Sequence, residues 1–446
     1  MDLTVGDIGN LVRKVAFPSS VGFLFNTLFN VVDNIFTGYI GSEALAGLAI
    51  SFPVFFILIA LGSGVGTGVT AIISNYIGEG RIEKAREVAR DALSLGIIVS
   101  LVITGIGVTA DEYLMRAMGG EGLTLVYGLR YTNVIFLGTV FFVLNMVMNG
   151  ILSAQGDTVS YRNFLIVGFL LNIVLDPLSI LVLGMTTEGV ALATVVVQFI
   201  GNLYLLRRVR RSKIIAGKGF GLTIPHIGNY MEILSQGIPA SFNMMTIAMG
   251  VFIINYYVVR VGGSKAVAAF GVAMRIEQLA LLPAIGLNIA ALSITGQNYG
   301  AGRLDRVEET YRKTMKYGLI IMTTAMFVIL PLSRYLFYIF TRDMEVIHYG
   351  ISYFRVETLV FNSYVLLNIS VSVLQGLKRP KFPIVIGIYR QFAMPVILFP
   401  ALIAMVGSIY GIWWGIFAVN WSAAIVAVAY VRGVYLKLCR EERRSR

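Results

Sequence analysis

The chain has 446 residues, of which 57% are hydrophobic and 13% charged, and its mean hydropathy is +0.78. Soluble domains carry about 25% charged residues, so this composition excludes an ordinary soluble protein and indicates a helical protein that crosses a membrane many times. Cys439 is the single cysteine, which excludes an intramolecular disulfide and a cysteine-based metal site.

Uncharged, apolar segments long enough to cross a bilayer recur from end to end. The alternating pattern of a transmembrane barrel is not seen, and the first apolar run, which lacks a small-residue cleavage site, is expected to be a retained helix. The prediction is an all-α integral membrane protein with twelve transmembrane helices, over approximately 15–40, 45–73, 90–110, 132–153, 163–184, 188–206, 236–260, 266–296, 316–340, 350–374, 382–406 and 409–434.

The net charge of +12 is explained by membrane orientation, which the distribution of basic residues indicates, and does not imply nucleic-acid binding. Most of the 36 Lys and Arg residues lie at the termini or in loops after even-numbered spans. Loops after odd-numbered spans hold only Arg116, Arg130, Arg260, Lys265, Arg334 and Arg342. The positive-inside rule therefore places both termini in the cytoplasm, and the expected location is the plasma membrane, without a nucleic-acid partner.

The two halves of the sequence repeat. SNYIGEGRIEKA (74–85) aligns with GQNYGAGRLDRV (296–307), and a shift of about 222 residues also overlays 40–49 on 262–271. Each repeat holds six spans, so the copies face the same way, as in a parallel repeat. The expected domains are an N-lobe (1–206), a basic cytoplasmic linker (207–232) and a C-lobe (233–446).

Two carboxylates lie in the N-lobe spans without any Lys or Arg deep in the same spans: Asp33 and Asp176. An ionised Asp at mid-bilayer costs about 2.5–3.5 kcal/mol, so each must take up a proton or hold a cation. Asn172 lies one helical turn before Asp176, Pro177 frees a backbone carbonyl, and the sixth span supplies Thr194. These oxygen donors suit H⁺ or Na⁺ and predict a cation-coupling site.

Amide side chains on the same spans are candidates for a substrate pocket. Asn26 and Asn30 are spaced to share a helical face with Asp33, and Asn145 and Asn149 are one turn apart in the fourth span. The alternative is that these amides only bond helices together.

Two acids in the C-lobe spans have basic neighbours. Glu277 follows Arg275 by two residues and Glu357 follows Arg355 in the same way. Side chains two apart on a helix do not face each other, so the prediction is a structural charge network that pairs these four residues across spans 8 and 10.

The glycines of GSGVGTG (62–68) are not a phosphate-binding loop, because no GK[ST] follows them. Gly64, Gly66 and Gly68 are instead expected to allow close helix packing within the second span.

FNVVDNIFTGYIG, AQGDT, LNIVLDP, GVALAT and GQNYGAGR, in this order, resemble the multidrug and toxic compound extrusion (MATE) transporters over essentially the whole chain. The resemblance implies two six-helix bundles that export amphipathic, often cationic compounds in exchange for H⁺ or Na⁺ by alternating access. It implies no enzyme activity and no cofactor. Small amphipathic compounds, the coupling ion and membrane lipids are the expected partners of a monomer.

The resemblance is closer to the DinF-like prokaryotic branch. Matching motifs imply a cation site at Asp33, Asn172, Asp176 and Thr194, which would hold Na⁺ if the protein is Na⁺-coupled. They also imply a pocket Tyr at Tyr131, a pocket Asn at Asn149, and helix bending at Pro18.

Two other functions compete. One is a lipid-linked saccharide flippase of the same superfamily. The count of twelve spans and the absence of Lys or Arg deep within the N-lobe spans argue against it, and the C-lobe arginines favour it. The other is a membrane-embedded enzyme, which would need clustered acids or a histidine set for a metal; the only histidines, His226 and His348, fall in predicted loops.

Overall fold

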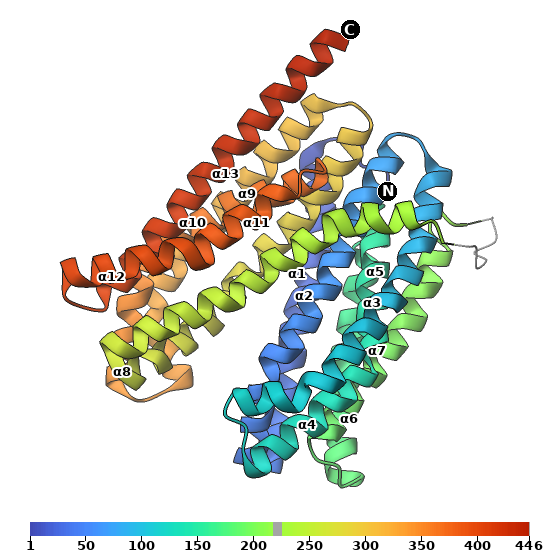
Figure 1. The fold of residues 1–446 in the computed structure, drawn as a ribbon. Helices are drawn as coiled ribbons and strands as arrows, with labels where there is room; N and C mark the ends of the chain where they lie inside the picture. Colours follow the sequence, from blue (N-terminus) through green and yellow to red (C-terminus); the bar gives the residue numbers. More distant parts are fainter. Residues whose placement is uncertain (217–224, 446) are drawn as a thin grey trace. The chain divides into compact units, whose positions relative to one another are not determined.

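The computed structural model describes residues 1–216 and 225–445. These residues form helices and turns and contain no strand (Figure 1). Ten of the described helices, some of them continued by a π-helical turn, are long and apolar enough to cross a membrane, and the bent pair α4–α5 makes an eleventh span. Helix α8 contains two of the twelve predicted spans, so all twelve lie in helical segments.

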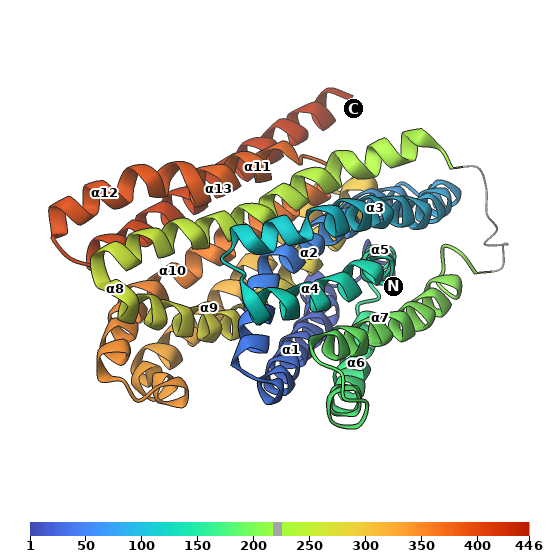
Figure 2. The same ribbon diagram turned by 60° about the horizontal axis from the view of Figure 1, so that its bottom comes forward.

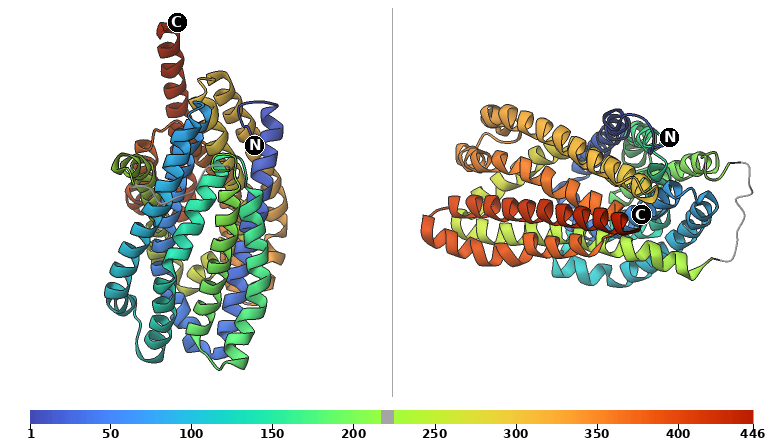
Figure 3. Two further views of the ribbon diagram at one scale, coloured as in Figure 1. Left: turned by 90° about the vertical axis from the view of Figure 1, so that its right-hand side faces the viewer. Right: turned by 90° about the horizontal axis from the view of Figure 1, so that it is seen from above.

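The first half of the chain contains seven α-helices and one π-helical segment within its described residues, and α2 packs against α3, α4 and α5 (Figure 1). In chain order they are α1 (Ile8–Ile40), α2 (Ser42–Gly78), α3 (Ile82–Ala117), α4 (Gly122–Leu137), α5 (Thr139–Ala154), α6 (Val159–Pro177), η1 (Leu178–Val182) and α7 (Thr187–Arg210). Helix α7 packs against α4, α5 and α6, as the left panel of Figure 3 allows the reader to follow.

In the second half, α10 packs against both α9 and α13 (Figure 2). The elements are α8 (Ile227–Gly300), α9 (Leu304–Phe340), α10 (Met344–Gly376), α11 (Lys381–Ile388), η2 (Tyr389–Ala393), α12 (Met394–Val406) and α13 (Tyr410–Ser445). Aromatic rings fill the core of this half: Tyr353 packs edge-on against Phe270 and Trp413, with ring centroids 5.6 and 5.0 Å away. The buried Trp413 indole donates to Ser352 Oγ at 3.1 Å.

The chain divides into two compact units whose borders fall inside helices. The first unit contains residues 1–2 and 21–242, and the second contains 3–20 and 243–446. The predicted lobes, 1–206 and 233–446, differ from these units because the starts of α1 and α8 each belong to the opposite unit. The predicted linker, 207–232, is also too long: α7 continues to Arg210, α8 begins at Ile227, and 217–224 lie outside the described residues.

Three local features interrupt the helices. At Gly138 the axis bends by 52° between α4 and α5, and a Cβ there would meet Val195 Cγ2 at 2.4 Å, so only glycine fits. Gly263, with φ 66° and ψ −166°, breaks α8 between predicted spans 7 and 8. After Pro177, which cannot donate a backbone hydrogen bond, the chain continues as the π-helical turn η1.

The predicted glycine packing is present in the first unit. A Cβ at Gly66 would lie 2.7 Å from the carbonyl oxygen of Met146, and one at Gly150 would lie 2.4 Å from that of Gly66. On the neighbouring turns, a Cβ at Gly64 or Gly68 would meet the backbone of α8 at Gly237 or Ile233. The backbones of α2, α5 and the start of α8 therefore touch directly, as small residues allow in membrane helices.

Candidate functional site

The structure brings the two N-lobe acids together in the first unit. Asp33 lies on α1 and is 5% exposed, and Asp176, on the last turn of α6, is fully buried. Asn172 Nδ2 donates to Asp33 Oδ1 at 3.0 Å. Asp176 and Thr194 are close enough to Asp33 to interact with its carboxylate, and Thr194, on α7, is 4% exposed. Helices α1, α6 and α7 thus contribute one cluster of buried oxygens.

Several of these oxygens have no hydrogen-bond donor. Both carboxylate oxygens of Asp176, and Oδ1 of Asn172, are buried without a hydrogen-bond partner in the described part of the chain. Leaving a buried polar group unsatisfied costs about 1–3 kcal/mol, and more for a charged one. No Lys or Arg side chain lies within 4.0 Å of either acid among the described residues. The carboxylate, amide and hydroxyl oxygens of the cluster are suitable ligands for a proton or a small hard cation.

Tyr131 on α4 lies beside this cluster. It is 6% exposed and close enough to interact electrostatically with both Asp33 and Asp176. Ser179 Oγ, in η1, donates to the carbonyl oxygen of Asp176 at 2.9 Å, so the π-helical turn after Pro177 supplies a hydroxyl to the backbone at the site.

The four asparagines expected in a substrate pocket lie in different surroundings. Asn145 is buried, and its Nδ2 donates to Gln198 Oε1 at 2.8 Å. Asn145 Oδ1 accepts a hydrogen bond from Asn202 Nδ2 at 3.2 Å. These hydrogen bonds join α5 to α7, as expected if Asn145 bonds helices together.

The other predicted residues are more accessible. Asn149 is half-buried and accepts a hydrogen bond from Ser153 Oγ at 3.2 Å. Asn26 and Asn30 are exposed within their unit, and Asn30 Nδ2 donates to the carbonyl oxygen of Asn26 at 3.0 Å. Pro18 lies inside α1, two residues before the border at which that helix passes from the second unit to the first.

In the second unit the predicted charge network is only half correct. Glu277 and Glu357 do interact with each other, with Tyr353 donating to Glu277 Oε2 at 2.9 Å and Tyr364 to Glu357 Oε1 at 2.8 Å. Arg275 and Arg355, however, are exposed and form no ion pair among the described residues. Residues two apart on a helix point to different sides, so a glutamate that faces the core turns its neighbouring arginine outward.

The basic residue that faces this acid pair is Arg390, in η2, which the prediction missed. It interacts electrostatically with both glutamates and its guanidinium lies 5.9 Å from the Tyr364 ring centroid. Arg390 Nη1 also donates to Asn420 Oδ1 at 3.3 Å. Its position inside the apolar run 382–406 was a signal available in the sequence.

Replacing Arg390 with Met is expected to destabilise the protein by on the order of 3 kcal/mol, because the buried Glu357 and the half-buried Glu277 then lose their basic neighbour. Thermal unfolding in detergent measures this. The double variant with Glu357→Gln should recover most of the loss, and the exposed Arg275→Met serves as the matched control. Equal melting of R390M and wild type would contradict a structural role for Arg390.

The chain combines three features: membrane-spanning helices, a pair of buried acids without a basic partner, and an internal repeat. Together they are typical of a secondary transporter rather than an enzyme. The family model described as MatE matches residues 18–178 and, separately, 239–399, so its second match begins 221 residues after the first. That spacing is within one residue of the predicted repeat.

Individual proteins of this kind match most of the chain. A curated "FAD transporter" of Shewanella oneidensis is 25% identical over 392 residues, 86% of this chain and 85% of the relative. A "Multidrug export protein MepA" of Staphylococcus saprophyticus is 23% identical over 93% of this chain and 91% of its own length. A solved structure titled as the outward-facing conformation of a multidrug resistance MATE family transporter matches with a TM-score of 0.91, at 28% identity and 98% coverage of both chains.

The chain belongs to the MATE family of membrane transporters. It is a multi-pass membrane protein with the twelve-helix fold of that family, and it is a transporter rather than an enzyme.

Proposed function

We propose that this protein is an antiporter that exports small amphipathic, often cationic compounds across the plasma membrane in exchange for H⁺ or Na⁺. The observation that carries the proposal is the cluster of Asp33, Asn172 and Asp176, in which both Asp176 oxygens and Asn172 Oδ1 have no hydrogen-bond donor and neither acid has a basic neighbour among the described residues. The names of the multidrug export relatives support the class of cargo.

The coupling ion acts by neutralising this cluster. With a proton or Na⁺ bound, Asp33 and Asp176 lie side by side at little electrostatic cost. Without it the two carboxylates repel each other and attract a positively charged compound. An ion can change the conformation only if it binds two states with different affinity. The helix that carries Asp33 contains Pro18, two residues before the border of the two units, and a bend at that proline is the proposed link between ion binding and movement.

The same oxygens serve either ion. Carboxylate, amide and hydroxyl groups are ligands for Na⁺, and two adjacent carboxylates can also share a proton. The proposal therefore includes both ions, with Asp33, Asn172, Asp176 and Thr194 as ligands for Na⁺. Tyr131, Asn149, Asn26 and Asn30 are the proposed substrate-contacting residues. The positive-inside distribution supports cytoplasmic termini.

Purified protein in proteoliposomes, loaded with a fluorescent cationic compound, tests the coupling. An imposed Na⁺ gradient and an imposed pH gradient are applied separately, and the expected result is export driven by at least one of them and absent in empty liposomes. Liposomes containing a labelled lipid-linked saccharide serve as the comparison. Flipping of that lipid without gradient-driven export would replace the antiporter proposal with the flippase.

A further inference from the structure

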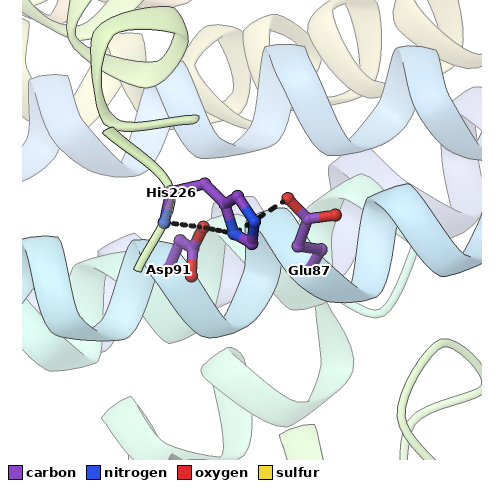
Figure 4. Close-up of side chains that lie close together, drawn as sticks. All are labelled: Glu87, Asp91 and His226. Carbon is purple, nitrogen blue, oxygen red and sulfur yellow. Dashed lines mark hydrogen bonds and ion pairs between the residues drawn. The ribbon is translucent and has the colours of Figure 1, made fainter. Parts of the chain in front are cut away.

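A second cluster of ionisable groups lies outside the transport site, at the start of α3. His226, directly before α8, points at two acids of α3 (Figure 4). Its Nδ1 lies 3.3 Å from Glu87 Oε1 and 3.8 Å from Asp91 Oδ2, and the three atoms all lie within 4.8 Å of one another. All of these residues belong to the first unit.

The internal repeat shows what is unusual about this cluster. At the 222-residue shift, Glu87 aligns with Glu309, Asp91 with Lys313 and Asn229 with Asp7. In the second unit these residues form a closed ion-pair set, in which Lys313 Nζ lies 2.9 Å from Asp7 Oδ1 and 3.0 Å from Glu309 Oε1. The hydrogen bond from Lys313 lowers the pKa of Asp7 below its ordinary value.

The first unit keeps one of these contacts but has no cation at the position of Lys313. Asn229 Nδ2 donates to Glu87 Oε1 at 2.7 Å and to Asp91 Oδ2 at 2.6 Å, and the second of these contacts corresponds to that between Asp7 and Lys313. Where the repeat has the ammonium of Lys313, however, this unit has the carboxylate of Asp91, whose side chain is 3% exposed. The ammonium at this position of one copy is therefore replaced by a carboxylate in the other, where the neighbouring cation is Lys84, which pairs with Glu87 Oε1.

We propose that Glu87, Asp91 and His226 bind a divalent transition-metal ion, with Zn²⁺ as the reference ion. Ligands at about 2.0–2.2 Å from a tetrahedral ion lie roughly 3.4 Å apart, which the 3.3 and 3.8 Å separations from His226 Nδ1 approach. An imidazole with two carboxylates favours Zn²⁺ over Mg²⁺, which prefers oxygen ligands and water.

The surroundings can support such a site. Asn229 and the backbone N–H of His226, 3.2 Å from Asp91 Oδ2, hold the carboxylates in place, as outer-shell donors do in metal sites. The His226 side chain is 65% exposed, so an ion can enter from solvent. Lys84 Nζ, 2.8 Å from Glu87 Oε1, is the group that the ion must displace. The bound ion would fasten the start of α8 to α3.

Zinc titration by calorimetry on the full-length chain, purified without a histidine tag, tests the proposal. Because His226 and His348 are the only histidines, His348→Ala is a matched control. Wild type and H348A are expected to bind one Zn²⁺ per chain, and His226→Ala, at an exposed position, to bind it at least tenfold more weakly. Lys84→Gln should bind it more tightly.

Absence of zinc binding at one ion per chain in the wild type, or equal affinity in H226A and H348A, would overturn the proposal. Asp91→Lys is a second variant, which introduces the residue found at the equivalent position of the other repeat, Lys313. It should keep the fold through an ion pair with Glu87 and no longer bind Zn²⁺. Hydrogen exchange over residues 225–232 should slow on zinc addition in the wild type and stay unchanged in H226A and D91K; slowing in these variants would also count against the site.

Discussion

Replacing Asp33 with Asn is expected to abolish gradient-driven export while the protein remains folded in the membrane. Asn is nearly isosteric and can still accept the hydrogen bond from Asn172 Nδ2, which lies 3.0 Å from Asp33 Oδ1 in the wild type. It cannot take up a proton or supply a negative charge to Na⁺. Export in proteoliposomes and compound resistance of expressing cells should both fall to the level of empty controls.

The matched control is Glu112→Gln, which removes a carboxylate from an exposed position, where its one ion pair among the described residues is with Arg116. Surface ion pairs contribute about 0–1 kcal/mol, so this variant should transport as the wild type does. Full export by D33N at equal expression would remove Asp33 from the coupling site and leave the antiporter proposal without its central residue.

Replacing Gly66 with Leu is expected to prevent the first unit from folding. The new Cβ would lie 2.7 Å from the carbonyl oxygen of Met146, and backbone atoms cannot move aside as a flexible side chain can. Overpacking of a core typically costs about 1–3 kcal/mol, and a clash between two helix backbones should exceed that range. The measurement is the fraction of monodisperse protein after detergent extraction, together with its melting temperature.

Gly105→Leu is the control for this experiment. Gly105 lies in α3, and a Cβ at this position would meet no atom of the described residues within 4 Å apart from its own stretch of helix. The same side chain at that position should leave the yield and melting temperature near those of the wild type. If G66L were as stable as G105L, direct contact between α2 and α5 would not be important for the fold.

The spans were the easiest feature to predict, because apolar length and the distribution of Lys and Arg depend only on local composition. The break at Gly263 was anticipated as the gap between spans 7 and 8, although the helix continues on both sides. The borders of the compact units were not predictable in this way. Residues 3–20 and 225–242 join the opposite unit through long-range packing, which hydropathy does not report.

For the candidate cation site, the sequence indicated which residues take part and the physical reason for their role. An acid in an apolar run needs a partner, and the absence of one at Asp33 and Asp176 predicted the cluster that the structure assembles. The same reasoning failed in the second unit, since Arg275 and Arg355 are neighbours in sequence and turn outward in space. Arg390, more than thirty residues from either glutamate along the chain, reaches them only through the packing of distant helices.

The exchanged segments at the starts of α1 and α8 bear on how such a protein could have arisen. Residues 3–20 and 225–242 are equivalent at the shift of 222. Residues 3–20 of the first repeat belong to the second unit, and residues 225–242 of the second repeat belong to the first unit. This is the arrangement of a domain-swapped homodimer. A six-helix ancestor with this exchange would have needed a second copy to complete its unit.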